Sequence, residues 1–238
     1  MKHLFIFLAV LSVACSAYSQ TKMFINKTTG TDSLWLSEIR NITFKTYACP
    51  RTVTYAGRTY NTVLIGTQCW LKENLNVGTM IQGTDTASKN GTIEKYCYNN
   101  MPAYCDTFGG LYQWNEAMEY STTAGTQGIC PSGWHIPTVD EFLTLASTVS
   151  NDGNALKAVG QGTGGGAGTN TSGFSALLAG ARNYNGVFNY LGYGTYFWLS
   201  TEYNVTSAYF LYLEYNLSGL HGYNVSKGYG LSVRCLED

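Results

Sequence analysis

The sequence is short of charge. Only 12% of its 238 residues are charged, and 14 basic against 15 acidic side chains leave a formal net charge of −1. Proteins hold nucleic-acid phosphates with patches of basic side chains, so this composition excludes nucleic acid as an expected partner. The sequence also lacks a run of the roughly 20 apolar residues that a membrane helix needs, and we therefore expect no transmembrane segment.

Metal-binding patterns are scarce as well. The chain contains three histidines and no Cys-x-x-Cys pair. Structural zinc sites need a full set of closely spaced cysteine and histidine ligands, which this sequence does not supply. We therefore expect neither a metal nor another cofactor.

The first 19 residues, MKHLFIFLAVLSVACSAYS, predict a secretory signal. They have a basic start, an apolar run over residues 4–14 and small residues before Gln20, which is typical of a cleavage site. We expect an exported protein that is secreted, periplasmic or displayed at the cell surface. Cys15 offers an alternative, lipidation and anchoring, although Ser12 stands where lipoprotein signals carry an aliphatic residue.

Loss of the signal leaves an even number of cysteines. They are Cys49, Cys69, Cys97, Cys105, Cys130 and Cys235. An even count in an exported chain predicts disulfide bonds, but six cysteines permit about 15 pairings, and the count alone does not choose among them.

The chain predicts a short N-terminal element and one main domain. Within residues 22–45, KMFINK alternates apolar and polar residues, TTGT turns, and SLWL and ITF resume the strand pattern. We assign residues 20–46 to an N-terminal β-hairpin segment and residues 47–238 to the main domain. The main domain is long enough to bury a core of its own.

The clearest predicted helix begins after Thr138. Thr138 and Glu141 form a capping box, and apolar residues follow at helical spacing at Phe142, Leu145, Ala146 and Val149. Asp140 and Glu141 then occupy the first helical turn, where the helix dipole favours negative charge. A second helix is expected within residues 109–120, with Trp114, Ala117 and Met118 facing inward.

The rest of the main domain predicts loops and strands. Cys97 and Cys105 bracket a proline-containing loop, and the glycine-rich residues 160–173 predict a flexible loop, because they lack the Lys-Ser/Thr pair of a phosphate-binding loop. Residues 174–238 alternate tyrosine-rich runs with Gly and Asn turns, which predicts an antiparallel sheet. Alternate residues of a strand lie on opposite faces. The tyrosines of such runs therefore form either an exposed binding platform or part of the core.

Several separated motifs together resemble one known family. In chain order they include YNTVLIGTQCWLKENL, YCYNN, CDTFGGLYQW, CPSGWHIPTVDEF and GYGLSVRCLED. From about Tyr55 to Asp238, this series resembles the Fibrobacter succinogenes major paralogous domain family. Such domains occur in exported bacterial proteins, and the resemblance implies no established biochemical activity.

A more distant similarity implies a fold. GWHIPTVDEF resembles a stretch of the formylglycine-generating sulfatase-modifying domain, and GLSVRC resembles the last strand of that domain. The resemblance implies an α+β, C-type-lectin-like fold with short antiparallel strands, about two helices, many loops and disulfide staples. The Glu-Pro-Asn and Trp-Asn-Asp motifs of calcium-binding lectins are absent, since the nearest stretch is FWLSTEYN, and calcium-dependent sugar binding is therefore not expected. The enzymes of this group bind copper with a cysteine pair, but no second cysteine lies close to Cys235.

In lectin-like folds a disulfide often secures the last strand, so we expect a Cys130–Cys235 bridge. On the chain-entropy model, this long loop would stabilise the fold by roughly 4.8 kcal/mol, against roughly 2.6 kcal/mol for a short Cys97–Cys105 loop. The remaining pair is then Cys49–Cys69.

The alternative for Cys130 is a nucleophile activated by His135 or His221. A separate enzymatic alternative is glycoside hydrolysis, which needs two carboxylates held close together in a cleft. The candidates are scattered along the chain at Glu73, Asp106, Glu116, Glu202 and Glu214.

These observations favour a non-catalytic surface or secreted domain that binds a glycan or an extracellular protein. One alternative is an extracellular enzyme that acts on polysaccharide or modifies exported proteins, and another is a structural surface component. Tryptophans inside the family motifs are expected to anchor the core, at Trp70, Trp114, Trp134 and Trp198. The sequence predicts no catalytic residue.

Overall fold

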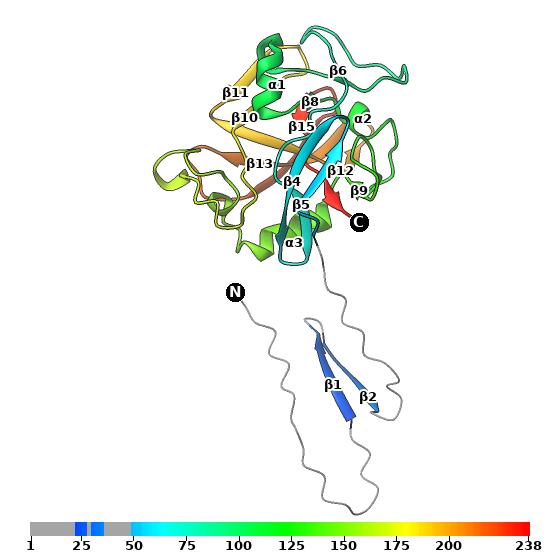
Figure 1. Cartoon of the computed structure of the whole chain (residues 1–238), viewed down its shortest axis with the longest axis vertical. Coiled ribbons are helices and arrows are strands. Elements are labelled where there is room, and N and C mark those ends of the chain that lie inside the picture. The colour runs from blue at the N-terminus through cyan, green and yellow to red at the C-terminus, as the bar shows by residue number, and fades with distance from the viewer. Residues whose placement is uncertain (1–21, 28–29, 36–48) are drawn as a thin grey trace, which may run out of the picture. The chain divides into compact units, whose positions relative to one another are not determined.

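The computed structural model describes residues 22–27, 30–35 and 49–238, and the chain divides into two units after Thr46. In the first unit, β1 (Lys22–Lys27) and β2 (Gly30–Trp35) pair as an antiparallel hairpin (Figure 1). The predicted signal, Cys15 and the strand expected after Trp35 lie outside the described residues.

The second unit, Tyr47–Asp238, contains a seven-stranded sheet. Its strands are β11 (Phe188–Leu191), β10 (Ala179–Arg182), β12 (Gly194–Asn204), β13 (Ser207–Glu214) and β14 (His221–Ser226) in spatial order, with β15 (Leu231–Ser232) and β8 (Leu111–Tyr112) extending from β12. The tyrosine-rich C-terminal region therefore forms a sheet, as predicted. Its pairing is mixed, because β12 runs parallel to both β10 and β15.

A second sheet is built from both ends of this unit and one strand from its middle. In spatial order it contains β3 (Thr52–Tyr55), β4 (Arg58–Ile65), β5 (Gln68–Leu71), β16 (Leu236–Glu237) and β9 (Trp134–His135). A short parallel pair, β6 (Thr79–Met80) and β7 (Glu94–Lys95), lies apart from it.

Within residues 49–238, three α-helices accompany the strands. They are α1 (Pro102–Phe108), α2 (Trp114–Ala117) and α3 (Val139–Thr148). The capping box that starts α3 is present as predicted, and α2 is shorter than expected. The loop predicted between Cys97 and Cys105 was wrong for residues 102–105, because these residues belong to α1. Pro102 there occupies the start of α1, where its missing N–H costs nothing. No helix among the described residues has the length and apolar composition to cross a bilayer.

The α+β class is therefore confirmed, with strands predominating. The core has two parts, and each face of the seven-stranded sheet borders one of them. The first part contains Trp114, Trp134 and Trp198, and the second contains Trp70 with Phe142 and Leu145 of α3. All four tryptophans are buried. Two of their indole N–H groups donate to backbone carbonyls, that of Trp114 to Leu199 and that of Trp198 to Tyr112, at 2.8 and 2.7 Å.

The last segment of the chain crosses from one sheet to the other. Ser232 in β15 lies opposite Phe197 of β12, and Leu236 in β16 lies opposite Trp70 of β5. Between them, the carbonyl of Cys235 accepts from the N–H of Leu71 at 3.1 Å. Residues 231–237 therefore join the two sheets.

Three disulfides join the described cysteines, Cys49–Cys69, Cys97–Cys105 and Cys130–Cys235. These are the pairs named from the sequence. The third bridge is completely buried and closes a loop of 105 residues onto the last segment. Disulfides persist in oxidising compartments, so they indicate an exported domain.

The glycine-rich stretch has a defined path instead of the expected flexibility. The ammonium group of the buried Lys157 donates to the carbonyls of Gly166, Glu214 and Leu217. A further backbone bond runs from the N–H of Thr163 to the carbonyl of Tyr215. The lysine therefore fixes the stretch against the end of β13, a long-range contact that composition does not reveal.

The long bridge should contribute more stability than the short one. We expect replacement of Cys130 and Cys235 by serine to lower the free energy of unfolding by about 4–5 kcal/mol, because the longer loop restricts the unfolded chain more. The matched Cys97→Ser, Cys105→Ser variant should lose only about 2–3 kcal/mol. Urea denaturation measures both losses, and an equal loss in the two variants would contradict this ranking.

Candidate functional site

A cluster of aromatic side chains covers one end of the seven-stranded sheet. We call it the tyrosine face, and it consists of Tyr190, Tyr196, Phe210, Tyr212, His221 and Tyr223. These residues come from β11, β12, β13 and β14. Register brings them together, because directly opposite residues of an antiparallel pair share a face. Tyr196 lies opposite Tyr212, and Tyr212 lies opposite His221.

The rings pack side by side. The centroids of Tyr196 and Tyr212 are 5.7 Å apart with an interplanar angle of 14°, and His221 stacks on the other side of Tyr212 at 5.1 Å. Tyr190 and Tyr223 extend the row at its two ends, each 5.9 Å from a neighbouring ring. Their exposed fractions are 54% and 57%, so the row opens to solvent at both ends.

Polar groups accompany the rings. The Tyr212 hydroxyl donates to the Glu214 carboxylate at 3.3 Å. Burial, together with this carboxylate, raises the pKa of the Tyr212 phenol, and burial also raises the pKa of Tyr196. The hydroxyls therefore keep their protons at physiological pH and remain hydrogen-bond donors beside an accepting carboxylate.

The two faces of the seven-stranded sheet differ in how far other parts of the domain bury them. On the opposite face of β12 and β13, Phe197, Leu199 and Leu211 are buried in the core part that includes residues of α3. On the tyrosine face, Trp198 is buried under the first core part, and Tyr196 and Phe210 lie only partly within it. The aromatic surface is thus the uncovered end of a core face.

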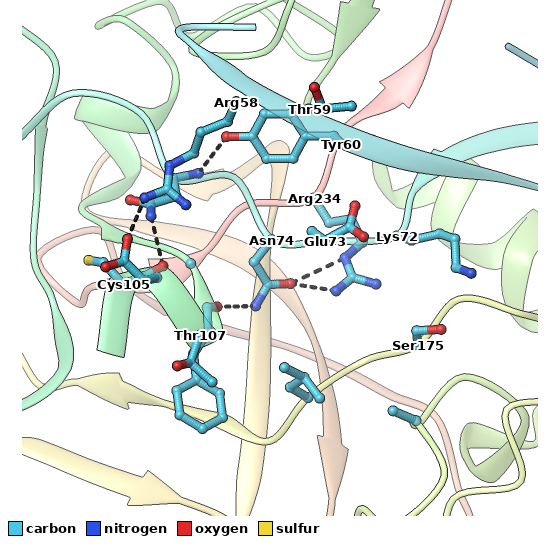
Figure 2. Close-up of a pocket in the computed structure, with 16 residues that line it drawn as sticks. Arg58, Thr59, Tyr60, Lys72, Glu73, Asn74, Cys105, Thr107, Ser175 and Arg234 are labelled. Atoms are coloured by element: carbon cyan, nitrogen blue, oxygen red, sulfur yellow. Dashed lines mark hydrogen bonds and ion pairs between the residues drawn. The ribbon is translucent and has the colours of Figure 1, made fainter. Parts of the chain in front are cut away.

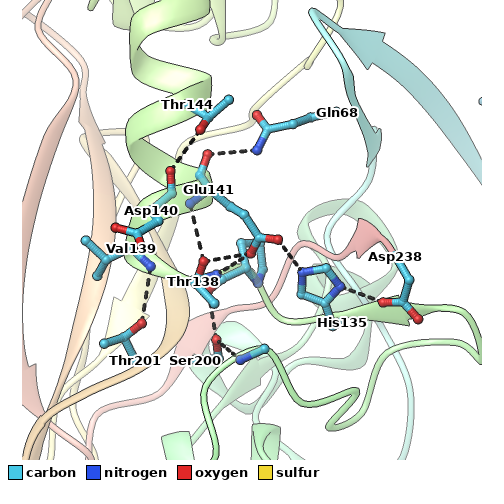
Figure 3. A network of polar contacts seen from close by, with 12 residues as sticks. Gln68, His135, Thr138, Val139, Asp140, Glu141, Thr144, Ser200, Thr201 and Asp238 are labelled. Atoms are coloured by element: carbon cyan, nitrogen blue, oxygen red, sulfur yellow. Dashed lines mark hydrogen bonds and ion pairs between the residues drawn. The ribbon is translucent and has the colours of Figure 1, made fainter. Parts of the chain in front are cut away.

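The stretch ICPSGWHIPTVDEF contains a second polar group of residues, centred on His135 (Figure 3). The imidazole is buried between two carboxylates, with Nδ1 at 2.7 Å from Asp238 and Nε2 at 2.9 Å from Glu141. Glu141 also accepts from the N–H and the hydroxyl of Thr138, each at 2.8 Å. The capping box of α3 is therefore tied to the residue that follows β16.

Charge stabilises this arrangement. Burial alone would lower the pKa of His135, but the hydrogen bonds that its imidazole donates to the Glu141 and Asp238 carboxylates outweigh burial and raise the pKa. Burial alone would raise the pKa of Glu141, but bonds from His135 and Thr138 lower it to about 2. A protonated imidazole donates from both nitrogens, so each carboxylate then has its own N–H.

This geometry gives Cys130 no catalytic partner. Its sulfur is bonded to Cys235, His135 is held by the two carboxylates, and His221 stacks on Tyr212. The described residues also contain no cluster of three or more His, Cys, Asp or Glu side chains arranged to hold a metal ion.

The carboxylates considered for hydrolysis lie in different places. Glu116 accepts from Tyr120 and from the N–H of Glu94, and Glu202 pairs with Lys227. Glu214 belongs to the surroundings of the tyrosine face. Of these candidates, only Glu73 and Asp106 line one cavity together (Figure 2), and none of the residues of the tyrosine face lines it.

The histidine network should make stability depend on pH. The His135 pKa is raised on folding, so its contribution is complete below the unfolded value of about 6.5 and is lost as the pH rises through the folded value. The Glu141 pKa is lowered, so its contribution is complete above about 4.5 and is lost as the pH falls toward 2.

We therefore expect His135→Gln to lower the free energy of unfolding by roughly 1–3 kcal/mol near pH 5.5, and by less near pH 9. Urea denaturation across this pH range measures the difference. Asp140→Asn is the control, because Asp140 lies in the same helical turn without contacting His135, and it should leave the alkaline slope unchanged. A His135→Gln effect of constant size from pH 5 to 9 would refute the charged network.

Comparison with known proteins bears on the whole domain. The sequence model of the Fibrobacter succinogenes major domain (Fib_succ_major) matches residues 63–237. No curated protein and no solved structure matches the chain, so the C-type-lectin-like fold remains a prediction. The matched stretch covers most of the chain and contains both the last segment and the tyrosine face. The chain belongs to the Fibrobacter succinogenes major domain family.

Proposed function

We propose that this exported domain is a non-catalytic module that binds glycans through the tyrosine face. The observation that carries the proposal is the row of stacked rings that ends in Tyr190 and Tyr223, both more than half exposed. Clustered exposed aromatic rings mark binding surfaces, because soluble proteins seldom leave large contiguous apolar patches open to water.

The chemistry of the face suits a sugar. One side of a pyranose ring presents C–H groups that pack on an aromatic ring, while its hydroxyls need hydrogen-bond partners. Tyrosine supplies both an apolar ring and a polar edge. The carboxylate of Glu214 accepts from the Tyr212 hydroxyl and has further lone pairs that can accept from a sugar hydroxyl next to the stacking surface.

A binding role also fits the rest of the domain better than catalysis does. A glycosidase needs two carboxyl groups held on either side of the scissile bond. Glu73 and Asp106 share a cavity, but Asp106 pairs with Arg58, and Glu73 accepts two hydrogen bonds from Asn61. We also propose the C-type-lectin-like fold, on the support of a last segment that is fixed by a disulfide and paired in both sheets.

A glycan array with the exported chain tests the proposal. We expect binding to neutral glycans, and Tyr223→Ala should weaken it about threefold to tenfold, because an aromatic stacking contact contributes roughly 0.5–1.5 kcal/mol. Tyr203→Ala is the matched control. Tyr203 is 54% exposed but packs on Tyr209, outside the tyrosine face.

Chelation provides a second check. Stacking on rings requires no cation, so binding should persist in the presence of EDTA. Loss of binding on chelation, or equal losses in the Tyr223→Ala and Tyr203→Ala variants, would contradict the proposed surface.

A further inference from the structure

The domain contains a cavity, lined by charged as well as apolar groups, that does not share a residue with the tyrosine face. Its volume is about 310 Å³. Side chains reach it from β4, from the segment after β5, from the end of α1 and from the chain between β15 and β16 (Figure 2). Ligand sites in proteins range upward from roughly 300 Å³, so this cavity can hold a molecule the size of a monosaccharide.

The most unusual residue of the cavity wall is Arg234. It is 2% exposed, and none of the described carboxylates forms a salt bridge with it. Its Nε and one Nη donate to the Asn74 side-chain oxygen at 3.2 and 2.6 Å, and the other Nη donates to the Phe174 carbonyl. Each Nη carries a second N–H. Among the described residues, no further acceptor is in contact with these N–H groups.

Burying an unpaired charge is costly, and the cost falls when an anion approaches. Burial lowers the pKa of Arg234 to about 9, so the guanidinium is still charged at neutral pH. The centre of the Phe174 ring lies 4.3 Å from the guanidinium carbon of Arg234, so the ring restricts the orientation of the guanidinium. The cavity wall therefore contains a fixed cation that forms no salt bridge with a described carboxylate, although the charge of Glu73, on the same wall, partly offsets the effect of burial on its pKa.

The guanidinium is oriented by a rigid support. The Asn74 amide also donates to the carbonyl of Phe108 at 2.8 Å, which fixes the side chain between Arg234 and the end of α1. Gly109 allows this approach, because it has φ of +82° and a Cβ there would lie 2.5 Å from that of Asn74.

Two further donors of the wall lack acceptors among the described residues. The Tyr60 hydroxyl accepts from the N–H of Asn76 at 3.1 Å but donates to no described group. Burial raises its pKa, so it keeps its proton. The ammonium group of Lys72 forms no ion pair with a described residue.

The two carboxylates of the wall, in contrast, already have partners among the described residues. Asp106 pairs with Arg58, and Glu73 accepts from the N–H and the side chain of Asn61 at 2.7 and 2.8 Å. Three cations (Arg58, Lys72 and Arg234) and two carboxylates line the cavity, which leaves a net charge of +1. That balance suits a single negative charge better than the double charge of a phosphate monoester.

We propose that this cavity binds a ligand of monosaccharide size that carries one carboxylate, with Arg234 and Lys72 as the groups that recognise the carboxylate. A sugar acid has this chemistry, either free or as a residue of an acidic polysaccharide. The inference does not depend on the tyrosine face, because the two surfaces are built from different residues.

Isothermal titration calorimetry of the exported chain tests the proposal with galacturonate and galactose, which differ at the carboxylate. We expect galacturonate to bind at least tenfold more tightly. Lys72→Met should weaken galacturonate binding about threefold to tenfold, and the exposed control Lys89→Met should leave it unchanged. Arg234→Lys, checked by thermal melting, should abolish the preference for the acid. If the Arg234→Lys variant does not fold, the difference in galacturonate binding between Lys72→Met and Lys89→Met tests the proposal instead.

Equal affinity for galacturonate and galactose would overturn the proposal, and so would tighter binding of galactose 6-phosphate or equal losses in the two lysine variants. A galacturonate trimer distinguishes the source. Tighter binding of the trimer supports a polysaccharide ligand, and tighter binding of the monomer supports a free acid. Tyr223→Ala should leave galacturonate binding unchanged, so failure of one proposed site is distinguishable from failure of the other.

Discussion

The architecture depends on the last seven residues before Asp238, which are shared by both sheets. β15 pairs with β12 and β8, and β16 pairs with β5 and β9. The buried Cys130–Cys235 bridge attaches this segment covalently to the stretch before β9 and therefore restricts the unfolded chain as well. Asp238, which follows the segment, bonds to His135, and His135 bonds to Glu141 in the capping box of α3. Without residues 231–237, each sheet would expose an unpaired edge and part of its core face.

Both proposed sites derive their geometry from this segment. Through β15 the segment pairs with β12, and β12 also pairs with β13. These pairings hold Tyr196 of β12 beside Tyr212 in the tyrosine face. The segment also places Arg234, between β15 and β16, against Asn74 and Phe174. A stable scaffold of this kind presents a ligand surface with little ordering cost on binding. The division between an aromatic surface and a cationic cavity would let one domain contact neutral and acidic parts of a glycan.

Local patterns predicted the local parts of this structure. The capping box at Thr138 placed α3, and strand alternation placed the tyrosine runs, because each signal lies within a few neighbouring residues. The family resemblance guided the disulfide assignment. The tyrosine face could be predicted only as one of two alternatives, since exposure depends on which elements cover each face. The contact between His135 and Asp238, the fixed glycine-rich stretch and the cavity around Arg234 join residues far apart in sequence, and no local pattern encodes such contacts.

Native-state hydrogen exchange tests the central claim, that the last segment makes the two sheets one cooperative unit. The informative amides are those of Leu71 and Leu75, which donate to carbonyls of the last segment, and those of β12 paired with β13. The account predicts that both groups exchange with the free energy of global unfolding. Exchange of either group at a clearly lower free energy, with the other still protected, would contradict it.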